Sequence, residues 1–239
     1  MSYRIKPEFA AYGLAGLLFL SAPLTATAGN LGIAAKAGTL GLGLEADYII
    51  NDKFSVRVQG NQLDYDYDLD EDGIEYQATL ELATFGALLD WHPFGGAFRV
   101  SIGGYSNGNE ASGVAGGPGE YQIGDDIYVV DDNDEFRMSA EIGMGDSFAP
   151  YAGIGWGHST SNDGGLLLSL DVGVLFQGET TVNLTASGSV YDTNSDTTID
   201  VTNNAEFQNQ LRTEEANLQD DLSDFDIYPV ITFGIGYRF

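Results

Sequence analysis

Large apolar residues alternate with small or polar ones along most of the chain from Thr39 to its end. The stretch TLGLGLEADYI, for example, puts Leu40, Leu42 and Leu44 on one face of a strand and glycine or acidic residues on the other. Alternation with a period of two predicts β-strands that have one apolar face. Similar segments recur up to the closing IYPVITFGIGYRF, so the sequence predicts an all-β protein.

The connections between these segments favour a membrane barrel over a soluble sandwich. In chain order the odd-numbered connections are short, whereas two of the even-numbered ones, Asn107–Asn133 and Asp192–Asp226, are long. Outer-membrane barrels have this asymmetry, with short periplasmic turns and longer external loops. Aromatic residues near both ends of the segments predict two interfacial girdles, with Phe148 and Phe176 on the short-turn side and Trp156 on the long-loop side. We therefore expect an antiparallel up-and-down transmembrane β-barrel.

The direction of the chain predicts the number of strands. The last strand ends on the short-turn side, so an N-terminus on that side needs one more upward segment, for which LGIAAKAG is the candidate. Bacterial single-chain barrels have even strand numbers. We expect ten strands, with turns at Asp146–Pro150 and Gln177–Glu179. Eight strands are the alternative if LGIAAKAG and TTVNLTASGSVY lie outside the barrel.

The last long external connection, at about 191–226, contains one predicted helix. Phe207, Leu211, Leu218 and Leu222 recur there at helix-like intervals. We expect a short amphipathic helix that packs its apolar stripe against the barrel mouth.

The N-terminus has the pattern of a secretory signal peptide. Arg4 and Lys6 precede an apolar run from Phe9 to Leu20, and Ala28 ends a small-residue cleavage site. The run is shorter than the ~20 apolar residues of a spanning helix. We therefore expect a signal peptide at 1–28, a barrel at 29–239 and export to the outer membrane.

The chain is strongly acidic, with 36 Asp and Glu against 9 Lys and Arg and a formal net charge of −27. This charge argues against nucleic acid as a partner, because phosphates attract basic surfaces. The absence of cysteine excludes disulfides and thiolate metal sites. We expect outer-membrane lipid and lipopolysaccharide as partners, divalent cations as candidate ligands of the acidic outer face, and no cofactor.

Charged residues within the predicted strands alternate with the apolar ones and therefore face the lumen. On the lipid face an isolated charge would cost about 2–4 kcal/mol near the midplane. The predicted lumen charge network consists of Glu45, Asp47, Arg57, Glu81, Arg99, Arg137, Glu141, Asp171 and Arg238. Two interpretations stay open: a salt-bridged plug that closes the lumen, or the lining of a narrow water-filled pore.

The acidic stretch LDYDYDLDEDGIEY is a candidate cation-binding segment. An EF-hand is excluded, because counting from Asp68 puts Thr79 where a bidentate Glu is required. A looser divalent-cation site remains, with candidate ligands Asp66, Asp68, Asp70 and Asp72. The alternative is a solvated external hairpin whose charge prevents aggregation.

The last strand, with Tyr237 and the C-terminal Phe239, resembles the terminal signature of bacterial outer-membrane β-barrels. That resemblance implies an insertion signal read by the barrel-insertion machinery. The segments KAGTLGLGLEA, LLDWHPFGG, DVGVLFQG and DDLSDFDIYPVITFGIGYRF resemble small proteobacterial porin-like proteins. This likeness implies a fold and a location, and it carries no catalytic residues.

We expect no enzyme. The stretch GHSTSNDGG resembles the His-x-Ser-Asn segment of lipid A deacylases, but Ser161 stands three residues after His158 rather than two, and no Glu follows at a suitable spacing. A pair of His158 with Asp163, as in an omptin-like protease, is weaker still. The sequence thus predicts a narrow porin-like or structural outer-membrane protein; a cation-binding surface protein and a lipid A deacylase-like hydrolase are the alternatives.

Overall fold

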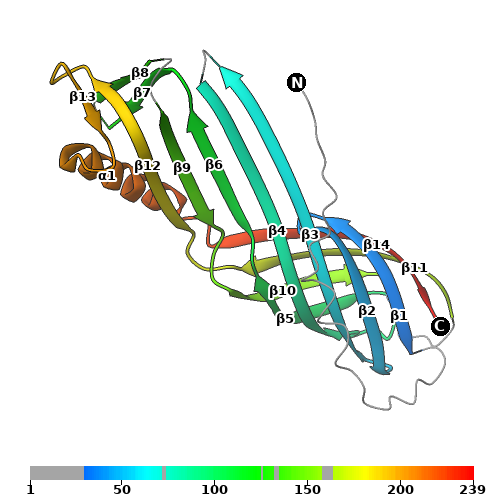
Figure 1. The fold of residues 1–239 in the computed structure, drawn as a ribbon. Coiled ribbons are helices and arrows are strands. Elements are labelled where there is room, and N and C mark those ends of the chain that lie inside the picture. Colours follow the sequence, from blue (N-terminus) through cyan, green and yellow to red (C-terminus); the bar gives the residue numbers. More distant parts are fainter. Residues whose placement is uncertain (1–29, 72–73, 125, 132–134, 158–163) are drawn as a thin grey trace.

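The computed structural model describes residues 30–71, 74–124, 126–131, 135–157 and 164–239. In this part the chain forms fourteen strands and one helix, which confirms the predicted all-β class with a single helix (Figure 1). The expected signal peptide, residues 1–28, lies outside the described residues.

Eight of the strands close into a ring in which every strand has two antiparallel neighbours. In ring order they are β3 (Phe54–Glu71), β2 (Gly41–Asn51), β1 (Leu31–Gly38), β14 (Ile227–Arg238), β11 (Gly165–Phe176), β10 (Phe148–Trp156), β5 (Arg99–Asn107) and β4 (Ile74–Trp91). Pairing of β3 with β4 completes the ring, so the fold is an antiparallel β-barrel. We call the end of the ring at Phe239 lower and the opposite end upper.

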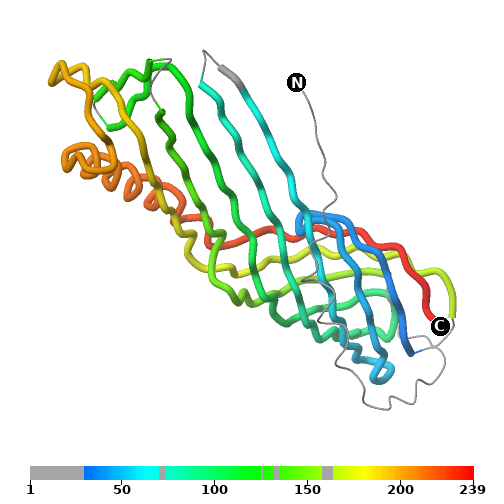
Figure 2. The backbone as a smooth tube through the Cα atoms, in the orientation of Figure 1, coloured from blue at the N-terminus to red at the C-terminus, as the bar shows by residue number. Residues whose placement is uncertain are grey.

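The remaining strands continue the sheet beyond the upper end of the ring (Figure 2). We call this part the extension. It consists of the upper parts of β3 and β4 together with β6 (Glu110–Gly116), β7 (Gly119–Ile123), β8 (Asp126–Val130), β9 (Phe136–Gly143), β12 (Thr181–Asp192), β13 (Thr197–Asp200) and α1 (Ala205–Leu222). The strands pair in the order β3, β4, β6, β9 and β12, and the small strands join at β12.

The ring contains eight strands rather than the expected ten because two expected turns do not reverse the chain. Across Asp146–Pro150, β9 and β10 both run downward, antiparallel to β6 and β5. Across Gln177–Glu179, β11 and β12 both run upward. Consequently two of the ten expected segments lie outside the ring, β9 and TTVNLTASGSVY (β12), whereas LGIAAKAG lies inside it as β1.

Because the chain does not reverse at these two points, several aromatic residues lie at the opposite end of the ring from the one predicted. Phe148 begins β10 and Phe176 ends β11, so both lie at the upper end of the ring. Trp156 lies at the lower end, where its ring centroid is 5.2 Å from that of Phe98.

Alternation along the ring strands separates a charged interior from an apolar exterior. On β2, Leu42 and Leu44 are 63 % and 60 % exposed, whereas Glu45 and Asp47 are each 2 % exposed. Neighbouring residues differ in exposure because successive side chains of a strand point to opposite faces. No helix in the described part of the chain is long and apolar enough to cross a membrane.

The extension has a core of its own, in which α1 packs against the sheet. Asn204 caps the helix by accepting a hydrogen bond from the Phe207 backbone N–H at 2.9 Å. Phe207 is fully buried and packs edge-on against Tyr128, with centroids 5.1 Å apart. The helix was expected at the barrel mouth; instead it covers β12, where Glu215 accepts a hydrogen bond from the Leu184 backbone N–H.

Candidate functional site in the barrel lumen

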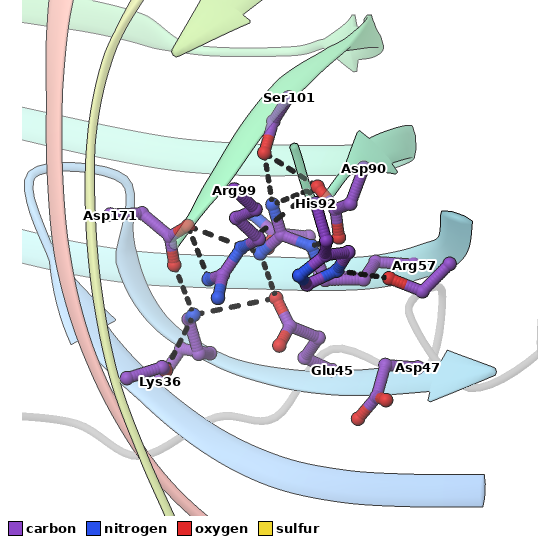
Figure 3. Close-up of polar contacts among 12 residues, drawn as sticks. Lys36, Glu45, Asp47, Arg57, Asp90, His92, Arg99, Ser101 and Asp171 are labelled. Carbon is purple, nitrogen blue, oxygen red and sulfur yellow. Dashed lines mark hydrogen bonds and ion pairs between the residues drawn. The ribbon is translucent and has the colours of Figure 1, made fainter. Parts of the chain in front are cut away.

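Charged side chains from six ring strands meet at one level inside the barrel (Figure 3). We call this group the lumen network: Lys36, Glu45, Arg57, Asp90, Arg99, Ser101 and Asp171. Its charged side chains are at most 5 % exposed. Buried charges require partners, since an unpaired ion in a medium of low dielectric constant is costly.

Asp171 on β11 is the acidic centre of the lumen network. Its Oδ2 accepts a hydrogen bond from Lys36 Nζ at 2.7 Å. Its Oδ1 accepts from Arg99 Nη2 at 2.6 Å and from Arg57 Nη1 at 3.3 Å. One carboxylate therefore contacts three cations that come from β1, β3 and β5.

Arg57 on β3 is the basic centre. Its Nε and Nη2 donate to the two carboxylate oxygens of Asp90 at 2.5 and 3.0 Å, a bidentate geometry suited to the planar guanidinium. Its Nη1 donates to Glu45 at 2.9 Å. Ser101 accepts from Arg57 Nη2 at 3.1 Å and donates to Asp90 at 2.5 Å. The three basic residues of the network thus balance its three acidic residues, although the whole chain carries −27.

Two further groups of polar contacts lie near the lower end of the lumen. Arg238 Nη2 on β14 donates to Asp47 on β2, and both side chains are buried. His92 is 1 % exposed; its Nε2 lies 3.1 Å from Ser55 Oγ and its Nδ1 lies 3.0 Å from the Gly96 carbonyl oxygen. The His92 ring, which follows β4 directly in the chain, is therefore part of the interior.

Above the lumen network the interior becomes neutral and then apolar. Gln59 donates to the Tyr105 hydroxyl at 2.6 Å, and Asn61 donates to Thr84 at 3.0 Å. An apolar cluster fills the upper end of the ring: Leu40, Leu88, Tyr105, Ala149, Tyr151, Leu175 and Val230. The lumen is therefore filled by side chains at successive levels, as expected for a barrel of about eight strands.

Glycines make room for the two tyrosines of this cluster. A Cβ on Gly86 would lie 2.6 Å from Tyr105 Cδ1, and a Cβ on Gly173 would lie 2.6 Å from Tyr151 Cζ. Both distances are shorter than non-bonded carbon contacts allow, so the flat rings occupy the space that a side chain would need. The two rings pack edge-on, with centroids 5.6 Å apart.

Six of the nine residues predicted to form a lumen charge network lie inside the ring: Glu45, Asp47, Arg57, Arg99, Asp171 and Arg238. Glu81, Arg137 and Glu141 do not; they are exposed on β4 and β9 in the extension. The prediction was wrong for these three because β9 and the upper part of β4 leave the ring, so no lumen lies beside them.

Four further polar residues of the interior were not in the predicted charge network: Lys36, Asp90, His92 and Ser101. Lys36 stands in the alternating segment GIAAKAG, and Asp90 follows the apolar LL of LLDW. A single charge within an apolar strand segment was the available signal for both.

The remaining predicted residues are dispersed or outside the described part. Asp66 and Asp68 are exposed on the upper part of β3, and Asp66 accepts a hydrogen bond from Thr79 Oγ1 at 3.0 Å. The Asp70 side chain and all of Asp72 lie outside the described residues, as do His158, Ser161 and Asp163. Within the described part, no group of three or more His, Asp or Glu residues could hold a metal ion. Tyr237 and Phe239 point outward from the barrel and are exposed.

The fold and the site together define a closed antiparallel β-barrel with a side-chain-filled lumen and a sheet extension at one end. Solved structures share this fold. The Acinetobacter baumannii CarO2 structure matches with a TM-score of 0.56 and 16 % identity, and A. baumannii CarO with 0.55 and 17 %. Each comparison covers 88 % of this chain and 98 % of the other. No protein-family profile and no curated protein matches the chain.

Proposed function

We propose that this protein is an outer-membrane β-barrel. The support is the exterior of the ring, where large apolar side chains are exposed, among them Leu42, Leu44, Leu166, Leu168 and Phe233. In water such a surface would be costly, whereas in lipid it satisfies the hydrophobic effect. The structural likeness to A. baumannii CarO and CarO2 concerns the fold and agrees with this proposal.

Aromatic residues at the lower end of the ring support the same location. Exposed rings cluster there: Phe54, Trp91, Phe94, Trp156, Tyr237 and Phe239. Amphipathic rings at one level are typical of a girdle at the membrane interface. In this proposal Tyr237 and Phe239 also form the signal through which the barrel-insertion machinery inserts the last strand.

For the lumen we propose a narrow porin-like barrel that the lumen network holds closed. The observation that carries this proposal is the burial of Lys36, Arg57 and Arg99, whose side chains are at most 1 % exposed in the middle of the ring. An open water-filled channel would leave these cations accessible. Any conduction therefore requires the network to rearrange.

Single-channel conductance in a planar bilayer tests this function. We expect silence from the refolded unmodified protein and conducting steps from Arg99→Ala, because the truncation removes a side chain that fills the lumen. Arg137→Ala is the matched control, since it removes the same charge from an exposed position in the extension. Heat-modifiable electrophoretic mobility shows that each variant is folded, and Lys36→Met provides a second lumen variant if Arg99→Ala does not fold.

Steady steps in the unmodified protein would contradict the closed lumen. Silence in every folded variant would contradict the porin-like role and leave a structural barrel.

A further inference from the structure

The upper part of β3 is a free sheet edge. Pairing of β2 with β3 ends at Leu42 and Gln62, whereas pairing of β3 with β4 continues without a register shift to Glu71 and Ile74. Among the described residues, Leu63–Glu71 therefore has a strand on one side only (Figure 1). A free edge offers unpaired N–H and C=O groups to another strand.

The edge of β12, in contrast, is covered by side chains of α1. There, Gln219 of α1 accepts a hydrogen bond from the Val182 backbone N–H at 2.9 Å, and Glu215 accepts from Leu184 at 2.8 Å. Side chains of the helix thus occupy the edge of β12, and the described residues provide no such cover for β3.

The backbone groups that face this edge belong to aspartates. Lys53 directly precedes β3 and His92 directly follows β4. The Lys53 carbonyl oxygen accepts a hydrogen bond from the His92 N–H at 2.8 Å, so these two residues form a hydrogen-bonded pair of the β3–β4 ladder. In an antiparallel ladder, successive residues of a strand bond alternately to its two sides. Because the register is unbroken, the odd-numbered residues of β3 bond to β4, and the N–H groups of Asp64, Asp66 and Asp68 point to the open side.

The two faces of the edge strand differ in chemistry. Tyr65 and Tyr67 are each 43 % exposed on one face, where Leu63 and Leu69 are exposed as well. Tyr76 on β4 pairs with Leu69 and is also exposed on that face. The side chains of Asp64, Asp66 and Asp68 are exposed on the other face.

We propose that this edge binds an extended segment of a partner protein in which basic and apolar residues alternate. Such a segment would add a strand to β3 through main-chain hydrogen bonds. Its basic side chains would lie beside the aspartates, and its apolar side chains would lie beside the tyrosines and leucines. A second copy of this chain fits poorly, because pairing of two β3 edges would bring the two acidic rows together, and like charges on neighbouring strands are destabilising.

Binding of a synthetic peptide that alternates lysine and valine over about eight residues, the length of an ordinary strand, tests the proposal. The full-length mature protein is refolded in detergent micelles, and affinity is measured by fluorescence anisotropy of the labelled peptide. We expect saturable binding that weakens with salt. A peptide alternating glutamate and valine, and one with its lysines and valines in separate blocks, should not bind.

Two substitutions at one position separate the backbone contribution from charge. Asp66→Asn removes the charge and keeps the edge N–H. Asp66→Pro removes both, and proline is tolerated where the N–H faces away from the sheet. We expect Asp66→Pro to weaken binding roughly 3- to 10-fold more than Asp66→Asn, the effect of about one hydrogen bond.

A triple variant in α1 and the segment after it controls for net charge. Asp220→Asn, Asp221→Asn and Asp224→Asn remove three exposed charges away from β3, whereas Asp64→Asn, Asp66→Asn and Asp68→Asn remove three at the edge. The edge triple should weaken binding and the control triple should not. Absence of binding would overturn the proposal and leave the acidic row as a guard against edge pairing. Equal affinities of Asp66→Pro and Asp66→Asn, or equal losses in the two triples, would also overturn it.

Discussion

Arg57 and Asp171 form an ion pair across the full width of the barrel, with 3.3 Å between Arg57 Nη1 and Asp171 Oδ1. Three ring strands separate β3 from β11 in either direction, so the two residues stand on opposite walls. Two side chains that meet from opposite walls leave no continuous opening between them at this level. The same ion pair therefore obstructs the lumen and links opposite walls of the ring.

Asp171→Asn should destabilise the barrel, because it leaves Lys36, Arg57 and Arg99 short of their shared acidic partner. Removing one partner of a buried ion pair typically costs about 3–5 kcal/mol. We expect a lower denaturant midpoint for unfolding of the refolded protein, measured by the loss of the β-sheet circular dichroism signal. Asp221→Asn on the exposed face of α1 is the control and should leave the midpoint unchanged. Equal midpoints for the two variants would show that the Asp171 carboxylate is not important for stability.

Gly86→Ala should disturb the apolar upper end of the lumen without changing any charge. Its Cβ would lie 2.6 Å from Tyr105 Cδ1, and Tyr105 is 1 % exposed. Overpacking of a filled interior typically costs about 1–3 kcal/mol. Gly96→Ala is the matched control, since no heavy atom lies within 4 Å of its added Cβ. Unfolding midpoints of the two variants measure the difference, and no difference would mean that Tyr105 moves aside freely.

Much of the barrel interior was predictable because alternation is a local property of a strand. Glu45 and Asp47 face the lumen for the reason that the sequence analysis gave: their neighbours Leu44 and Ala46 lie on the opposite face. The expectation of one helix after Asp192 was also confirmed, because the apolar spacing and the Asn204 cap are both local.

The path of the chain at the upper rim was not predictable in this way. Asp146–Pro150 and Gln177–Glu179 contain the glycine, proline and polar residues of turns, yet the chain crosses both breaks without reversing. Whether such a break turns or continues depends on which strands lie beside it, a long-range property. For this reason Arg137 and Glu141 were predicted to face the lumen, although β9 lies outside the ring.

Phe207→Ala should loosen the extension and leave the ring intact. Phe207 is fully buried between Tyr128 and Phe136, and truncation of a buried Phe typically costs about 3–5 kcal/mol. The lumen network is made by the ring strands, so its contacts should persist. We expect faster proteolysis within α1 with unchanged heat-modifiable mobility of the barrel. Phe225→Ala is the control, because that ring is 59 % exposed. Loss of the mobility shift in Phe207→Ala would show that the two parts fold as one unit.

The extension should also lose stability in strong alkali through Tyr128. Burial, together with the nearby carboxylates of Asp126 and Asp192, raises the pKa of Tyr128 to about 12, and its hydroxyl donates to Gln210 at 2.6 Å. The unfolded chain loses this proton near pH 10. Because the folded pKa is the higher one, the stabilising contribution is complete below about pH 10 and is lost as the pH rises through 12.

Tyr128→Phe removes this titration, so the variant should show a shallower loss of stability than the unmodified protein between about pH 10 and 12. Proteolysis within α1 at stepped pH measures it. Tyr121 keeps its own raised pKa in both proteins and contributes equally to each. Parallel pH profiles for the two proteins would mean that the Tyr128 proton does not contribute to the stability of the extension.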